Sequence, residues 1–209
     1  MIGSRVVGTL AVVAAVSLAH LLTGRLPVVD LGGGRPFVES GEVGDEVHLS
    51  YADVKVTDVR PAQYLGPPVS TELARLAGGV WVVVSVRLSA TTKPVSIQNA
   101  WLVDPEGREY LTSSRSWCAT NLPVATGVAT YAVFCFDVPV TRLEGLHFRV
   151  ARGDVTTDQT SNDDLADFDL AVTSKDVKTW PDTTAAYRSE TYSLEPLELE
   201  EITLTETGS

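Results

Sequence analysis

Residues 80–88, VWVVVSVRL, show the strictest hydrophobic pattern in this chain of 209 residues. Val80, Val82, Val84, Val86 and Leu88 alternate with Trp81, Val83, Ser85 and Arg87. A period of two places alternate side chains on opposite faces of an extended strand and is incompatible with the 3.6-residue period of a helix. The segment therefore predicts a strand with one face turned toward a core.

Similar alternation predicts further strands in the middle of the chain. Phe134, Phe136 and Val138 share one predicted inward face, and Leu146, Phe148 and Val150 share another. The other predicted strands lie within residues 48–59, 96–104, 129–140 and 145–151. Only residues 70–79, STELARLAGG, resemble a helix, with a Ser/Thr start and a glycine stop. Short strands without intervening helices predict an all-β fold, an antiparallel β-sandwich over residues 45–153.

The first 25 residues predict a membrane anchor. Val6 to Leu22 contain no Lys, Arg, Asp or Glu and would span roughly 26 Å as a helix, which is short for a bilayer crossing. A cleaved signal peptide with Ser17 and Ala19 before the cut is the main alternative, and a buried helix of a cytosolic protein is a third. The membrane anchor and the cleaved signal peptide would both export the rest of the chain. The expected localisation is therefore the cell membrane, by a single pass, or secretion if the signal is cleaved. Residues 26–44 would be a flexible linker, and the sandwich would lie on the extracytoplasmic side.

Cys118 and Cys135 are the only cysteines. An exported chain lies where disulfides form and persist, so a disulfide between them is the favoured interpretation, with two free thiols as the alternative. Metal binding and thioredoxin-like redox chemistry are disfavoured because no CxxC spacing is present. Trp117 is expected to cover the disulfide as part of the core, with a surface contact as the alternative.

A family resemblance follows from turn and core motifs. GVWVVVSVRLSATTKPVSI is followed by AWLVDPEGREY, which contains an Asp-x-x-Gly-x-x-Tyr turn at Asp104, Gly107 and Tyr110. LPVATGVATYAVFCFDVPV then ends in a Phe-x-Val-Pro pattern. Over about residues 45–152 the chain resembles bacterial extracytoplasmic immunoglobulin-like domains related to the secreted immunoprotective antigen of mycobacteria. The resemblance implies an immunoglobulin-like fold, export and anchoring, and no particular activity.

The acidic charge is confined to the end of the chain. Residues 1–153 hold 13 of the 16 Lys and Arg and 13 of the 27 Asp and Glu, so residues 154–209 carry the whole net charge of −11. This acidic C-terminal extension is expected to be partly disordered, with possible extra strands at 168–173 and 194–205. A cation or a basic partner is the competing interpretation. The weak candidates for metal ligands are Asp158, Asp163, Asp164, Asp167 and Asp169, but the EF-hand pattern is absent.

No catalytic motif is present, since GxSxG, SxxK, HExxH and a phosphate-binding glycine loop are all missing. His48 and His147 are the only plausible exported bases. No cofactor is expected, and nucleic-acid binding is disfavoured because the exported part is acidic. We expect a non-catalytic binding or accessory module that contacts an envelope protein through exposed positions such as Trp81 and Arg87 and through the acidic extension. A structural subunit of an envelope or secretion complex and a hydrolase with an unrecognised site are the alternatives.

Overall fold

A computed structural model describes residues 37–67, 74–113, 117–152, 164–188, 192–196 and 199–201. The predicted membrane segment, residues 1–25, and most of the predicted linker lie outside these ranges. No helix within the described ranges is long and apolar enough to cross a membrane. Residues 35–209 belong to one compact unit, which contains all the described residues.

The alternating segment forms the central strand of a sheet. β4 (Arg75–Ala90) pairs antiparallel with β3 (Ala52–Gly66) on one side and with β8 (Thr130–Val138) on the other. The order of this sheet, called sheet 2 here, is β11-β3-β4-β8-β12, with β2 also paired to β3. The shorter strands are β2 (Glu46–His48), β11 (Ala186–Arg188) and β12 (Tyr192–Ser193).

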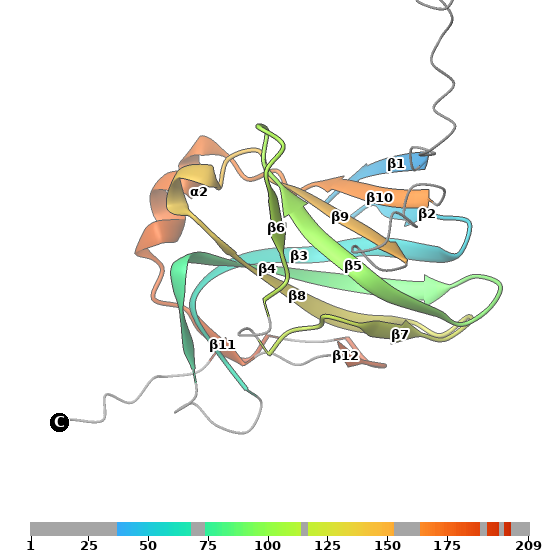
Figure 1. Ribbon diagram of the computed structural model, residues 1–209. Helices are drawn as coiled ribbons and strands as arrows, with labels where there is room; N and C mark the ends of the chain where they lie inside the picture. The colour runs from blue at the N-terminus through green and yellow to red at the C-terminus, as the bar shows by residue number, and fades with distance from the viewer. Residues whose placement is uncertain are drawn as a thin grey trace, which may run out of the picture. The chain divides into compact units, whose positions relative to one another are not determined.

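The opposing sheet, called sheet 1 here, has the order β1-β10-β9-β5-β6, with β7 also paired to β5. Its strands are β1 (Phe37–Glu42), β5 (Val95–Val103), β6 (Glu109–Leu111), β7 (Leu122–Val124), β9 (His147–Arg152) and β10 (Asp164–Asp169). Figure 1 shows β10, β9 and β5 in one layer and β3, β4 and β8 in the other. Two packed β-sheets confirm the predicted β-sandwich.

The prediction of purely antiparallel sheets is wrong at two edges. β1 pairs parallel with β10, and β11 pairs parallel with β3. In each pair the two strands lie more than a hundred residues apart in the sequence, so no hairpin turn forces them to run in opposite directions.

The core lies between the two sheets and consists of the side chains that the alternation predicted to face inward. Val82, Val84, Phe134 and Phe136 from sheet 2 meet Phe148 from sheet 1, and all five are buried. The Phe148 ring centroid lies 5.8 Å from that of Phe134 and 6.0 Å from that of Phe136, at the spacing of favourable aromatic pairs. The inward faces predicted for 134–138 and 146–150 are confirmed.

The helix predicted at 70–79 is wrong in its second half. Residues 75–79 are the first five residues of β4, and residues 70–73 lie outside the described ranges. Asp137 of β8 accepts hydrogen bonds from the backbone N–H groups of Gly78 and Gly79, at 2.8–3.0 Å. A Cβ at Gly79 would lie 2.2 Å from the carbonyl oxygen of Val138. The two glycines thus allow β4 and β8 to approach closely. The glycine pair that was predicted to end a helix instead makes a contact between two strands.

The acidic extension contributes strands to both sheets, so the fold continues past the expected boundary at 153. β10 occupies 164–169 and partly overlaps the strand predicted at 168–173. Phe168, Leu170 and Val172 belong to the main core. The chain then forms helix α2 (Ser174–Thr179), which begins with a capping box between Thr173 and Asp176. At the other end, β1 falls within the segment that was expected to be a linker.

Two short 3-10 helices complete the described elements, η1 (Val140–Arg142) and η3 (Trp180–Asp182). The Asp-x-x-Gly-x-x-Tyr motif forms the turn between β5 and β6. Asp104 accepts hydrogen bonds from the backbone N–H groups of Glu106 and Arg108, both at 2.9 Å, and from the Tyr110 hydroxyl at 3.1 Å. Gly107 has φ +80°, a conformation that favours glycine. The turn motif therefore has a structural role, which is to hold the β5–β6 connection.

Candidate ligand-binding site

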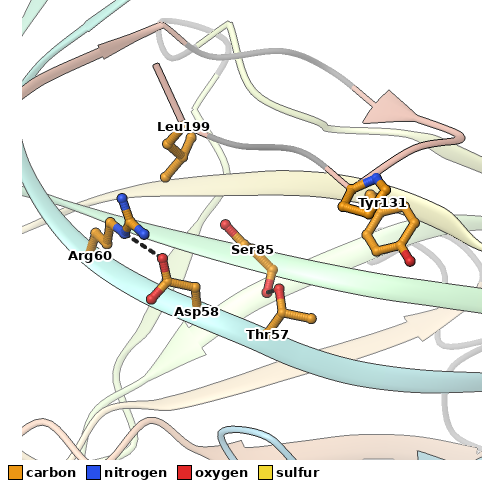
Figure 2. Close-up of a pocket in the computed structure, with 7 residues that line it drawn as sticks. Thr57, Asp58, Arg60, Ser85, Tyr131 and Leu199 are labelled. Atoms are coloured by element: carbon orange, nitrogen blue, oxygen red, sulfur yellow. Dashed lines mark hydrogen bonds and ion pairs between the residues drawn. The ribbon is translucent and has the colours of Figure 1, made fainter. Parts of the chain in front are cut away.

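A pocket of about 510 Å³ lies on the face of sheet 2 that is turned away from the main core, called the outer face here. The strands supply its floor, and the C-terminal segment 192–201 supplies the two remaining residues. The lining consists of Thr57, Asp58, Arg60, Ser85, Tyr131, Pro196 and Leu199. Figure 2 shows Leu199 near Arg60 and, at the other end, Tyr131. Pockets of about 300–1,000 Å³ are the usual size of small-molecule sites.

A β-bulge in β3 creates the polar floor. The register between β3 and β4 shifts between Val56 and Asp58, so Thr57 is the additional residue. Val54 and Val56 face the main core before the bulge, whereas Val59 packs against that core after it. The parity of the strand therefore changes, and Asp58 and Arg60 point to the outer face. Bulges commonly re-aim side chains in this way.

Asp58 and Arg60 form an ion pair within the pocket. They lie two residues apart on one strand and hence on the same face. Their side chains are 40% and 47% exposed, so both groups stay accessible to a ligand. Burial alone would lower the pKa of Arg60, but the Asp58 carboxylate and the Tyr187 hydroxyl outweigh it and raise the pKa. Arg60 is therefore a permanent cation with an adjacent counter-charge.

The remaining floor is made of hydroxyl groups from three neighbouring strands. Asp58 of β3 lies opposite Ser85 of β4. The Thr57 hydroxyl donates a hydrogen bond to the Ser85 carbonyl oxygen at 3.1 Å. Tyr131 of β8 lies opposite Arg87, one step along β4 from Ser85 on the same face. The pocket thus contains a carboxylate, a guanidinium, three hydroxyls and one aromatic ring.

Described residues of the C-terminal segment lie over the outer face and line one side of the pocket. β12 pairs antiparallel with β8 at Ala132 and Tyr131. Pro196 and Leu199 then line the pocket, and Glu201 forms a β-bridge with Tyr187 of β11. Of the strand predicted at 194–205, residues 197–198 and 202–205 lie outside the described ranges. The segment therefore covers this sheet of its own chain over the residues that are described.

Beneath the C-terminal segment, a second core covers another part of the outer face. Its buried members are Ala62, Leu65, Trp81, Val83, Cys118, Val133 and Cys135, and Ala77, Tyr187 and Leu199 pack against them. The predicted disulfide between Cys118 and Cys135 is confirmed, with 5.8 Å between the two Cα atoms. It ties the connection between β6 and β7 to β8, and so links the two sheets outside the main core.

Two predictions about tryptophans are wrong. Trp81 was expected to be exposed, but its side chain is 0% exposed and its Nε1 donates to the Arg75 carbonyl oxygen at 3.0 Å. The cause is the second core, which buries the face of β4 that the alternation pattern leaves to solvent. Trp117 was expected to cover the disulfide as core, but it is 42% exposed, with φ 56°.

Arg87 lies at the surface, as predicted, and borders the pocket through its neighbour Tyr131. Its side chain is 36% exposed, and its Nη1 donates to Glu46 Oε1 at 2.7 Å. Of the two predicted contact residues, Arg87 alone is positioned to meet a partner on this face.

The weak metal candidates have protein partners wherever the structure describes them. Asp167 pairs with His147 at 2.9 Å and with Arg149 at 2.8 Å, and Asp169 accepts a hydrogen bond from the backbone N–H of Ala171. Asp164 accepts one from the backbone N–H of Ser50. Asp158 and Asp163 lie outside the described residues. Within those residues no group of three or more His, Cys, Asp or Glu side chains could hold a metal ion.

The two candidate histidine bases lie apart, one on each sheet. His48 of β2 contacts Asp53, and the hydrogen bond and negative charge of that carboxylate raise the pKa of the imidazole. His147 of β9 contacts Asp167. Neither histidine lines the pocket.

The pocket residues Thr57, Asp58 and Arg60 were not predicted from the sequence. A signal for the bulge was present, because the apolar positions change from Val54 and Val56 to Val59, which breaks the period of two. A strand was predicted as possible at 194–205, but no sequence signal indicated that Pro196 and Leu199 would lie over this face.

Comparisons with known proteins gave structural similarity only. No family profile and no curated protein matches the sequence. The YjhA protein of Bacillus subtilis is 11% identical, with TM-score 0.44, and the match covers 61% of this chain and 99% of YjhA. The secreted protein MPT63 of Mycobacterium tuberculosis is 14% identical, with TM-score 0.44, over 64% of this chain and 97% of MPT63. An uncharacterized β-sandwich protein of Clostridium difficile is 9% identical, with TM-score 0.40, over 65% and 96%.

Proposed function

We propose that the protein is a membrane-anchored, extracytoplasmic binding or accessory module without catalytic activity. Its immunoglobulin-like domain would contact an envelope protein through the outer face of sheet 2. The observation that carries the proposal is the pocket on this face, where two accessible charged groups and hydroxyl groups from three strands meet the C-terminal segment.

The disulfide and the N-terminal sequence support the location. Cys118 and Cys135 are joined in the structure, and structural disulfides are typical of exported proteins. The apolar run Val6 to Leu22 precedes the folded unit and supplies the anchor in this proposal. The acidic composition of the exported part also fits a partner other than nucleic acid.

The chemistry of the pocket supports binding rather than catalysis. Catalysis requires a nucleophile or base held within reach of a stabilising group. His48 and His147 each contact a carboxylate at a distance from the pocket lining. Asp58 and Arg60 are bonded to each other, an arrangement suited to holding a ligand by hydrogen bonds.

The test is quantitative co-purification of partners with the full chain from membranes in mild detergent. Arg87→Glu reverses a charge beside the pocket, and Lys93→Glu is the matched control, since Lys93 is exposed in the turn after β4. Both variants must first show an unchanged thermal midpoint. The proposal predicts that Arg87→Glu lowers the recovery of a partner several-fold while Lys93→Glu leaves it unchanged.

Equal recovery with both variants would contradict the use of this face. A partner recovered at fixed stoichiometry would favour the structural-subunit alternative. Turnover of an envelope substrate that is lost on changing His48 or His147 would favour the hydrolase.

A further inference from the structure

We infer that the pocket binds a neutral, polyhydroxylated ligand, such as a sugar ring of an envelope glycan. The inference rests on the proposed function and goes beyond it, because it assigns the pocket a glycan ligand beside the protein contact proposed for the same outer face of sheet 2. Charge, hydrogen-bonding capacity and shape each support it.

The charges of the pocket are balanced in pairs. Asp58 neutralises Arg60 within the lining, and Glu46 neutralises Arg87 next to it. A ligand with a net charge would meet an attractive and a repulsive group side by side. The attraction would then not compensate for the free-energy cost of removing water from the charge. A neutral ligand avoids that cost.

The hydrogen-bonding groups match vicinal hydroxyls. A sugar hydroxyl donates and accepts at the same oxygen. The guanidinium of Arg60 has five N–H groups; Nε faces Asp58 Oδ2 and the Tyr187 hydroxyl is a second partner, which leaves N–H groups for a ligand. A hydroxyl pair can therefore accept from Arg60 and donate to Asp58 without breaking the ion pair. The hydroxyls of Ser85 and Tyr131 extend this polar floor.

The other side of the pocket is apolar. Pro196 and Leu199 line it from the C-terminal segment, and the Tyr131 ring stands at one end. Sugar rings combine hydroxyl edges with C–H faces, which pack against aromatic and aliphatic side chains. Figure 2 shows Leu199 on the side of the pocket opposite Asp58 and Thr57, so both kinds of surface are available to one ring.

A zwitterionic amino acid is the chemically closest rival ligand. Its ammonium group would take Asp58 and its carboxylate would take Arg60. Asp58 and Arg60 already form an ion pair with each other. An amino acid would have to replace that ion pair, whereas a sugar can hydrogen-bond to both side chains while the pair stays intact.

The experiment uses the full chain in mild detergent on an array of neutral and acidic glycans. The best neutral glycan and free glycine are then titrated by calorimetry. The inference predicts binding to at least one neutral glycan, weaker binding to its acidic counterparts, and no heat from glycine. Asp58→Asn should lower the affinity for the neutral glycan about tenfold, which is the loss expected when a hydrogen bond to a charged group is removed. It should also shift preference toward acidic glycans, since Arg60 loses its counter-charge.

Asp53→Asn is the matched control, because Asp53 lies on the same strand and outside the pocket lining. It should leave glycan binding unchanged. Binding to no neutral glycan, binding of glycine at the pocket, or equal effects of the two Asp→Asn variants would overturn the inference. If partner recovery depends on Arg87 but no glycan binds, only the ligand class is refuted. If partner recovery does not depend on Arg87 and no glycan binds, the proposed function is refuted as well.

Discussion

Asp104 shows how one residue fixes a turn and gives it a pH dependence. Burial alone would raise the pKa of this carboxyl group, but hydrogen bonds from the backbone N–H of Arg108, the Tyr110 hydroxyl and the backbone N–H of Glu106 outweigh it and lower the pKa. The folded state therefore stabilises the ionised form of Asp104 more than the unfolded state does. This contribution to stability is present above the unfolded pKa of about 4 and is lost as pH falls through the lower folded pKa.

We therefore expect Asp104→Asn to lower the midpoint of urea denaturation at pH 7 and to flatten its decline at low pH. The measurement is the urea midpoint between pH 7 and pH 3 for the wild type and the variant. Asp176, whose pKa is also lowered by hydrogen bonds from Thr173, is unaffected by the substitution and contributes equally to both curves. Parallel curves would show that Asp104 is not the group that titrates.

Asn99 is a buried polar residue whose side-chain amide makes no hydrogen bond within the described residues. Its side chain is 0% exposed, and within the described residues neither its Nδ2 nor its Oδ1 has a hydrogen-bond partner. An unsatisfied buried polar group costs about 1–3 kcal/mol. Asn99→Leu, which has a similar size, should raise the free energy of unfolding by about 1 kcal/mol, measured by urea denaturation. Leu102→Asn, which places the same amide in the main core, is the converse variant and should destabilise. A loss of stability in Asn99→Leu would contradict this interpretation.

Among the elements, the strands contributed by the acidic extension matter most for the fold. β10 lies between β1 and β9 in sheet 1, and Phe168 belongs to the main core. The C-terminal segment 192–201 instead packs on the outer face through Leu199. These two parts of the extension therefore differ in what they stabilise.

A chain that stops after Gly153 should fail to fold, because it lacks β10 and the core side chains that follow it. A chain that stops after Ser193 should fold, with a loss of about 1–3 kcal/mol for the burial of Leu199, and should have an open pocket. Thermal unfolding followed by circular dichroism distinguishes the two. A cooperative transition at the wild-type temperature in the shorter chain would refute the assignment of β10 to the core.

The disulfide is the element that joins the sheets outside the main core. Cys118 and Cys135 are separated by 17 residues, for which a crosslink is expected to contribute about 3 kcal/mol. Reduction of the wild type, or the double substitution Cys118→Ala and Cys135→Ala, should lower the free energy of unfolding by about that amount. Urea denaturation with and without reductant measures it, and the double variant should no longer respond to reductant. An unchanged urea midpoint on reduction would contradict a stabilising role.

The elements differ in how well local sequence predicts them. The strands around Val84, Phe134 and Phe148 were predictable because burial on one face imposes a period of two. The start of β4 was not, since Gly78 and Gly79 serve a contact with Asp137 that lies 58 residues away. The burial of Trp81 also escaped prediction, because the side chains covering it come from segments distant in sequence.

At the scale of the whole folded unit, the two faces of sheet 2 have different tasks. The inner face builds the main core with sheet 1. The outer face carries the second core, the disulfide and the pocket under one C-terminal segment. The central claim is that this outer face is the recognition surface.

Site-specific photo-crosslinking in intact cells tests that claim most directly. A photoreactive amino acid replaces Thr57, which is exposed at the pocket, or Leu111, which is 55% exposed on β6 of sheet 1. The account predicts a crosslinked species of higher mass from position 57 and none from position 111. Crosslinking from position 111 alone, or to the same extent from both positions, would contradict it.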